Sequence, residues 1–177
     1  MDKTAVSKQI SYWLRHDPEG LEMDEEGYVD LDELLEKLRE RFPEVDRELV
    51  EEINGEGKRR YEIKDGRMRA IYGHSIEVDL GLPEDEEVEE VYHGTTSDAA
   101  YRILRNGLKP KDRNMVHLSA TKDIAEEVGK RRTEDPVILR IGVESAREDG
   151  LKFYRATDEI YLSEEIPPKF IEKIDQR

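Results

Sequence analysis

The Asp65-Gly66 pair limits the fold of the first half of the chain more sharply than any other feature. It lies between two short runs of strand-like residues, 60–63 and 68–72. Aspartate and glycine at adjacent positions supply the positive φ angles that a two-residue hairpin turn needs. The sequence therefore predicts two antiparallel strands joined at Lys64-Asp65-Gly66.

Three helix patterns precede this hairpin. Residues 2–16 place apolar side chains at helical spacing, residues 31–41 carry a leucine stripe, and a third helix is expected over 47–54. Asp30 and Asp46 are suitable N-caps for the second and third helices. With a short strand expected at 21–24, the order is that of a winged helix, a module that binds nucleic acid or protein partners.

The segment 82–90 separates this half from the next, because it combines a proline with a run of acidic residues. We therefore expect two domains, 1–81 and 82–177. The second half alternates strands with two helices, and the predicted class is α+β with a mainly β second domain. The expected strands are 91–92, 116–119, 136–143, 150–153 and 160–162, and the expected helices are 98–105 and 122–131.

The charge of the chain restricts its partners. Aspartate and glutamate number 44 against 29 lysines and arginines, which gives a net charge of -15. A general electrostatic attraction to nucleic acid is therefore not expected, and an anionic substrate needs a local basic cluster. The chain has no cysteine, no apolar run that would span a membrane and no signal-peptide pattern, so a soluble cytoplasmic protein is expected.

One such cluster is the stretch 67–75. Arg67 and Arg69 are two positions apart, and on a strand both side chains lie on one face. Two guanidiniums on one face suit a phosphate, and His74 and Ser75 add short polar groups after the turn allowed by Gly73. The alternative is an ordinary solvated edge strand.

Further polar groups lie near the ends of other elements. Arg15 and His16 fall in the last turn of the first helix, where the helix dipole alone explains a cation. His93-Gly94-Thr95 is expected where a strand becomes a loop, and His117 and Ser119 share one face of a strand. Such pairs line a cleft for a sugar or nucleotide, or are simply polar strand faces. The histidines form no recognisable zinc motif.

Taken together, these motifs resemble those of the NAD-dependent RNA (tRNA) 2′-phosphotransferase family over essentially the whole chain. The resemblance rests on five motifs in the family's order and approximate spacing. They are Leu14-Arg15-His16-Asp17-Pro18, Arg69-Ala70-Ile71-Tyr72-Gly73-His74-Ser75, Tyr92-His93-Gly94-Thr95, Val116-His117-Leu118-Ser119 and Gly129-Lys130-Arg131.

The resemblance implies an N-terminal winged-helix lobe, a C-terminal ADP-ribosyltransferase-like lobe and an active site between them. It implies removal of an internal 2′-phosphate from RNA or tRNA, with NAD consumed as co-substrate and no metal required. The products would be RNA with a 2′-hydroxyl, nicotinamide and ADP-ribose 1″,2″-cyclic phosphate.

The resemblance also assigns roles to residues. The catalytic set falls on Arg15, His16, Arg69 and Arg131. The NAD-binding residues implied are His93, Gly94, Thr95, His117 and Ser119. The residues implied to hold RNA phosphates are Arg67, His74 and Ser75.

Two positions depart from the family pattern. Tyr72 stands where the family usually has glutamine, and Met115 stands where a histidine is common. Arg132 adjoins Arg131, so the choice between them rests on the Gly-x-Arg spacing.

Two alternative functions stay open. They are a transferase that stops after ADP-ribosylation and a winged-helix binding protein with a structural second lobe. We expect a monomer for which short 2′-phosphorylated RNA suffices.

Overall fold

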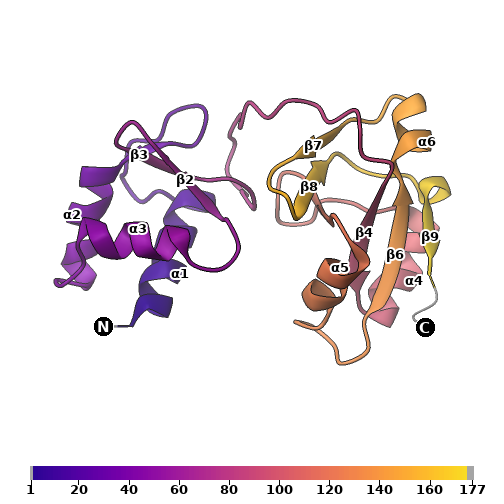
Figure 1. Ribbon diagram of the computed structural model, residues 1–177, viewed down its shortest axis with the longest axis horizontal. Coiled ribbons are helices and arrows are strands. Elements are labelled where there is room, and N and C mark those ends of the chain that lie inside the picture. The colour runs from indigo at the N-terminus through magenta and orange to yellow at the C-terminus, as the bar shows by residue number, and fades with distance from the viewer. Residues whose placement is uncertain (1, 175–177) are drawn as a thin grey trace. The chain divides into compact units, whose positions relative to one another are not determined.

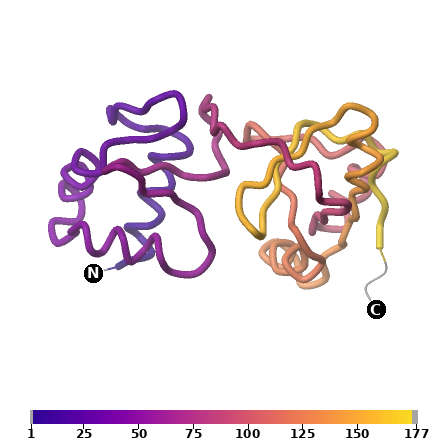
Figure 2. Tube along the Cα trace, turned by 45° about the horizontal axis from the view of Figure 1, so that its top comes forward, coloured from indigo at the N-terminus to yellow at the C-terminus, as the bar shows by residue number. Residues whose placement is uncertain are grey.

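The computed structural model describes residues 2–174, and the chain divides into two compact units, Met1–Gly81 and Leu82–Arg177 (Figure 1). Each unit contains its own cluster of buried hydrophobic side chains. Residues 71–89 form neither a helix nor a named strand, and Figure 2 shows the chain passing from the first unit to the second within this winding segment. The mixture of helices and antiparallel sheets confirms the α+β class. The winged-helix and ADP-ribosyltransferase descriptions stay predictions.

The first unit packs three helices against a small antiparallel sheet whose strand order is β1-β3-β2. Its elements are α1 (Lys3–Arg15), β1 (Val29–Asp30), α2 (Leu31–Arg41), α3 (Arg47–Gly55), β2 (Tyr61–Lys64) and β3 (Arg67–Ala70).

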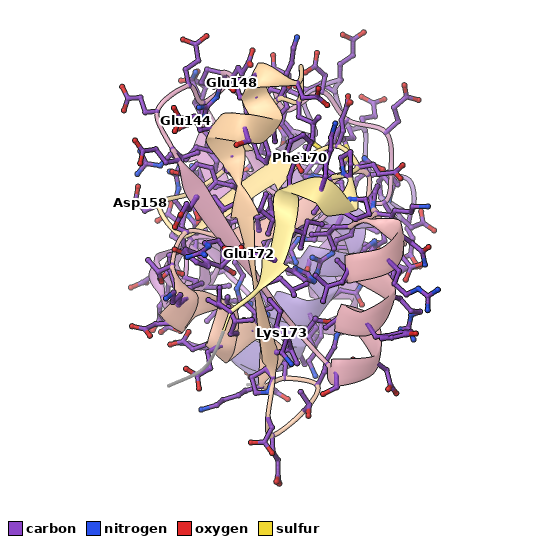
Figure 3. The ribbon with its side chains drawn as sticks, turned by 90° about the vertical axis from the view of Figure 1, so that its right-hand side faces the viewer. Glu144, Glu148, Asp158, Phe170, Glu172 and Lys173 are labelled. Atoms are coloured by element: carbon purple, nitrogen blue, oxygen red, sulfur yellow. The ribbon has the colours of Figure 1, made fainter. Side chains whose placement is uncertain are left out.

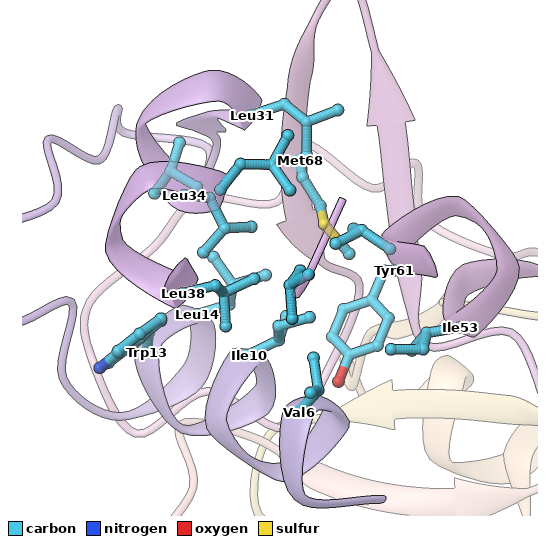
Figure 4. Close-up of a cluster of buried hydrophobic side chains, with 14 of the residues drawn as sticks. Val6, Ile10, Trp13, Leu14, Leu31, Leu34, Leu38, Ile53, Tyr61 and Met68 are labelled. Atoms are coloured by element: carbon cyan, nitrogen blue, oxygen red, sulfur yellow. The ribbon is translucent and has the colours of Figure 1, made fainter. Parts of the chain in front are cut away.

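The core of this unit comes from the apolar stripes of its helices. Figure 4 shows Ile10 and Leu14 of α1 facing Leu34 and Leu38 of α2, and all four side chains are fully buried. The expected caps are confirmed: the carboxylates of Asp30 and Asp46 accept hydrogen bonds from backbone N–H groups in the first turns of α2 and α3. These contacts fix where each helix begins.

The predicted hairpin is confirmed, because Asp65 and Gly66 have φ angles of 51° and 74°. Both angles lie in the positive range that the turn needs. The strand expected at 21–24 is wrong, since only Met23 forms a bridge there, with Val29. The Asp24 carboxylate instead accepts bonds from the backbone N–H groups of Glu26 and Tyr28 and bends the chain.

The second unit is built on a six-stranded antiparallel sheet with the order β7-β8-β5-β4-β6-β9. Its elements are β4 (Glu90–Thr95), α4 (Ser97–Asn106), β5 (Val116–Ser119), α5 (Lys122–Gly129), β6 (Val137–Gly142), α6 (Val143–Glu148), β7 (Phe153–Arg155), β8 (Ile160–Ser163), the 3₁₀ turn η1 (Pro168–Phe170) and β9 (Ile171–Lys173).

The sheet opens between its two central strands. Only Tyr92 and Ser119 pair between β4 and β5, whereas β4 pairs with β6 at six positions and β5 with β8 at four. The loop expected at His93-Gly94-Thr95 is wrong, because the ladder with β6 keeps these residues in the strand. The polar residues of β4 thus follow the point where β5 turns away.

One helix of this unit was not predicted. α6 carries Glu144 and Glu148, which project outward in Figure 3, so the described part of the unit has three α-helices instead of two. Beyond it, Glu172 on the edge strand β9 pairs with Arg140 of β6. Among residues 2–174, no helix is both long enough and apolar enough to cross a membrane.

Candidate active site

Arg15 and His16 lie at the C-terminal end of α1, where the segment after β3 passes. The carbonyl oxygen of Arg15 accepts hydrogen bonds from the backbone N–H groups of Ser75 at 2.9 Å and Ile76 at 3.3 Å. A terminal carbonyl without an intrahelical donor is satisfied in this way. These bonds join two motifs that are far apart in the sequence.

The ring of His16 contacts the hydroxyl group of Ser75. The distance from Nδ1 to Oγ is 2.8 Å, and both residues are exposed. Because a hydroxyl both donates and accepts, it serves either tautomer of the imidazole. Histidine suits proton transfer near neutral pH, so this contact orients a candidate acid or base.

The guanidinium of Arg15 is held by aromatic rings and by a glycine. Its Cζ lies 5.0 Å from the ring centroid of Tyr72 and 6.0 Å from that of Tyr61. Gly73 has a φ of 91°, and a Cβ there would lie 3.1 Å from Arg15 Nε. Gly73 therefore supplies both the turn and the space for this side chain.

The positive charge of Arg15 has no acidic partner among the residues that the structure describes. Its Nε and Nη2 are buried and make no hydrogen bond there, although the chain has 44 acidic residues. Buried donors of a cation are normally paired, and such pairs are the strong ones. The arrangement is therefore that of a site for an external anion.

Arg69 has the opposite surroundings. Its side chain is held by Glu62 at 2.9 Å from Nη2 and 3.0 Å from Nε, and by the backbone carbonyls of Glu26 and Leu80. Burial opposes ionisation of Glu62, but the hydrogen bond and charge of Arg69 outweigh it and lower the pKa of that carboxyl. Arg69 is only 8 % exposed and leaves at most one N–H for a ligand.

Arg67 and Arg69 share one face of β3, as predicted. Their guanidiniums stack on the ring of Tyr28, with Cζ 4.9 and 4.6 Å from its centroid. Arg67 is exposed, and its Nη1 lies 2.5 Å from a carboxylate oxygen of Asp24. Internal carboxylates therefore partly neutralise this pair before any phosphate arrives.

His74 follows Gly73 in the same segment, and its side chain is only 4 % exposed. Burial, followed by the charges of Arg15, Arg69 and His16, lowers the pKa of its imidazole to about 4. Its Nε2 is buried without a hydrogen-bond partner in the described chain. His74 is thus neutral at physiological pH, and its side chain is almost completely buried.

In the second unit, Gly94 allows α5 to pack on β4. A Cβ at Gly94 would lie 1.8 Å from the carbonyl oxygen of Ala125 in α5. His93 follows the sheet opening, and burial lowers the pKa of its ring to about 4 despite a bond to the backbone of His117. The close approach at Gly94 is therefore made by the helix.

Three further polar side chains border the opening. Thr95 and Ser119 are buried, and Nδ1 of His117 lies 3.0 Å from the carbonyl oxygen of Met115. Ser119 pairs with Tyr92 at the single register position that β4 and β5 share. Hydroxyl and imidazole groups at a break in a sheet suit the hydroxyls of a ribose.

Arg131 and Arg132 follow α5 and are both exposed. The charge of Arg132, together with that of Lys111, further lowers the pKa of His93. Motif spacing favours Arg131 of the two neighbouring arginines.

The aromatic supports of the arginines were missed by sequence reasoning. Tyr28 and Tyr61 lie in other segments, and nothing in their local pattern indicates a cation as neighbour. Tyr72 lies within the Arg69–Ser75 motif and adjoins Gly73, and this position is the only signal that the sequence offers for it. Residues 2–174 contain no group of three or more histidine and carboxylate side chains that would hold a metal ion.

Comparisons with known proteins find the same family over most of the chain. The family described as RNA 2′-phosphotransferase, Tpt1 / KptA family, matches residues 1–165. A protein of Thermococcus kodakarensis named "Probable RNA 2′-phosphotransferase" is 43 % identical, and the alignment covers 96 % of each chain. One of the same name from Acetivibrio thermocellus is 40 % identical over 97 % of each chain. "Probable RNA 2′-phosphotransferase 1" of Archaeoglobus fulgidus is 41 % identical over 95 % of this chain and 79 % of its own.

Proposed function

This chain belongs to the RNA 2′-phosphotransferase family, and on that premise we propose that it transfers an internal 2′-phosphate of RNA to NAD. The single observation that carries the proposal furthest is the guanidinium of Arg15, which has no acidic partner in the described chain. The backbone carbonyl of the same residue is bonded to Ser75, whose hydroxyl contacts His16. A fixed cation beside a proton-transfer group is what phosphoryl chemistry requires.

The proposed reaction has two steps. An oxygen of the RNA 2′-phosphate bonds to the anomeric carbon of the nicotinamide ribose, and the bond to nicotinamide breaks. The adjacent ribose hydroxyl then loses its proton and attacks phosphorus, while the bond to the RNA 2′-oxygen breaks. That oxygen takes a proton and leaves as a hydroxyl, and the other product is ADP-ribose 1″,2″-cyclic phosphate.

The proposed role of each residue follows from the groups that surround its side chain. Arg15 stabilises negative charge on the phosphate oxygens, because its charge is not neutralised internally. His16, oriented by Ser75, protonates the departing 2′-oxygen. Arg69 is proposed to add the positive charge of a buried side chain, and Arg131 that of an exposed guanidinium.

NAD is proposed to bind in the second unit along the opening between β4 and β5. The buried hydroxyl of Ser119 and the rings of His93 and His117 border this opening. A neutral His93 is suited to hydrogen-bonding a ribose hydroxyl, since an uncharged imidazole both donates and accepts.

The test is to incubate the protein with a short RNA that carries one internal 2′-phosphate, with and without NAD. Conversion of the RNA to a 2′-hydroxyl product that requires NAD supports the proposal. An ADP-ribosylated RNA as the final product would indicate a transferase that stops after the first step. Removal of the phosphate without NAD would contradict the role of NAD.

A further inference from the structure

Two large apolar side chains are exposed in the described residues, and one of them adjoins the proposed phosphate site. Tyr12 is 44 % exposed and Tyr101 is 62 % exposed. Tyr12 lies on α1 beside Trp13, which is buried in the core at 2 % exposure. The helix thus buries one large ring and presents the next one to solvent.

The position of Tyr12 is fixed relative to His16. Their ring centroids are 6.2 Å apart with an interplanar angle of 50°, as expected for residues four apart on a helix. The carbonyl oxygen of Tyr12 accepts bonds from the backbone N–H groups of His16 at 2.9 Å and Asp17 at 3.0 Å. The exposed ring therefore stands one turn from the groups proposed to receive the phosphate.

The covalent structure of a 2′-phosphorylated nucleotide places its nucleobase close to the phosphate, at about the distance of the Tyr12 ring from His16. In a nucleotide with a 2′-phosphate, the base is attached to C1′ and the phosphate to the neighbouring C2′. When Arg15 and His16 hold the 2′-phosphate, the base of the same nucleotide therefore lies within the width of one ribose from these two residues. Unpaired bases of RNA are commonly held by stacking on tyrosine and other aromatic rings.

We propose that Tyr12 stacks against a nucleobase of the RNA, beside the 2′-phosphate. This inference rests on the proposed function, which assigns the phosphate to Arg15 and His16. Every base offers a π-face, so the contact adds affinity without selecting a sequence. It also lets an acidic chain gain RNA affinity from a group other than a further cation.

The test measures how tightly variants bind RNA and how fast they react. The substrate is a short RNA with one internal 2′-phosphate, and its partner substrate lacks the base on that nucleotide and on both neighbours. We expect Tyr12→Ala to raise the Kd and KM for the base-containing RNA about tenfold, with kcat nearly unchanged. Tyr12→Phe keeps the ring and is expected to bind like the unmodified protein.

Two controls separate stacking on a base from a general loss of RNA binding. Tyr101→Ala removes the other exposed tyrosine and is expected to leave Kd and KM unchanged. On the substrate without bases, the unmodified protein and Tyr12→Ala are expected to have the same Kd. The KM for NAD is expected to be the same in all four proteins.

Several results would overturn the inference. They are an unchanged Kd for base-containing RNA in Tyr12→Ala, an equal loss on both substrates, or a fall in kcat alone, which would mean that Tyr12 acts through His16. A raised KM for NAD would assign the ring to the other substrate. Failure of the unmodified protein to react would contradict the proposed function, while the Kd comparison would still test the stacking.

Discussion

Arg15 and Arg69 carry the same guanidinium group in contrasting surroundings. The donors of Arg69 are bonded to Glu62 and to two backbone carbonyls, whereas Nε and Nη2 of Arg15 have no partner in the described chain. Arg69 thus joins β2, β3 and neighbouring loops. Arg15 is stabilised by aromatic faces and keeps its charge for a ligand.

Replacing each arginine by alanine is expected to separate these roles. Arg15→Ala should lower kcat by about a hundredfold or more, since comparable charge-stabilising donors contribute roughly 3–4 kcal/mol to the transition state. It should leave the free energy of unfolding nearly unchanged. Arg69→Ala should lower that free energy by roughly 2 kcal/mol, because Glu62 loses its partner. Urea unfolding followed by the fluorescence of the single tryptophan, Trp13, measures the first unit. Equal losses of stability in the two variants would contradict the assignment.

Gly73→Ala tests whether the turn positions Arg15. The new Cβ would lie 3.1 Å from Nε of Arg15, and the alanine would have to keep a positive φ. We therefore expect a loss of about 1–2 kcal/mol in stability together with a fall in kcat. Gly20→Ala is the matched control, because Gly20 has a φ of 97° and no atom within 4 Å. It should lose stability and keep its activity. Equal activity of the two variants would show that Gly73 has no part in holding Arg15.

At the scale of elements, the segment after β3 contains a pH-dependent contribution to stability. The pKa of the His74 imidazole is about 4 in the folded chain and about 6.5 for an ordinary histidine, so the folded state disfavours its protonation. Its contribution is complete above pH 6.5 and is lost as the pH falls toward 4, by about 3 kcal/mol in total. His74→Gln should therefore show a shallower loss of unfolding free energy over this range, measured with Trp13 fluorescence. Parallel curves for the two proteins would contradict a lowered pKa.

The contact between α5 and β4 is tested by Gly94→Ala. A Cβ 1.8 Å from the carbonyl oxygen of Ala125 forces the helix away from the strand, and we expect a loss of at least about 3 kcal/mol from the second unit. Gly142→Ala, at the paired end of β6, meets only an atom at 3.9 Å and should be nearly neutral. Calorimetry resolves the two results. A stable Gly94→Ala variant would mean that α5 does not pack as described.

Local sequence patterns predicted the helices and turns that depend on neighbouring residues. They did not predict features that depend on pairing between distant strands. The capped helices and the Asp65-Gly66 turn depend on neighbouring residues and were predicted. The extension of β4 through Thr95 depends on six pairs with β6, which are distant in sequence. The α6 helix is six residues long and has no side-chain cap, so it lacks the usual signal of a helix start.

The same division applies to the candidate site. Motif order predicted Arg15, His16 and Ser75, and the structure brings these three together. The burial of His74 and the pairing of Arg69 with Glu62 arise from tertiary packing, which spacing along one strand does not reveal. The same holds for Tyr28 beneath Arg67.

At the scale of the whole molecule, the net charge of -15 limits how RNA is held. Few phosphates can be contacted, so raising salt from about 50 to 200 mM should weaken binding of a short 2′-phosphorylated RNA by less than about tenfold. Titration of a labelled oligonucleotide measures this dependence. A thousandfold loss would indicate an extended basic surface, which the composition opposes.

The fate of the 2′-phosphate distinguishes transfer to NAD from simple hydrolysis, so the decisive measurement follows that group. An RNA whose internal 2′-phosphate carries ³²P is incubated with the protein and NAD, and the labelled products are separated. We expect the label to leave the RNA and to appear in a small nucleotide product containing ADP-ribose. Label released as inorganic phosphate, or label that remains on the RNA, would contradict the proposed transfer.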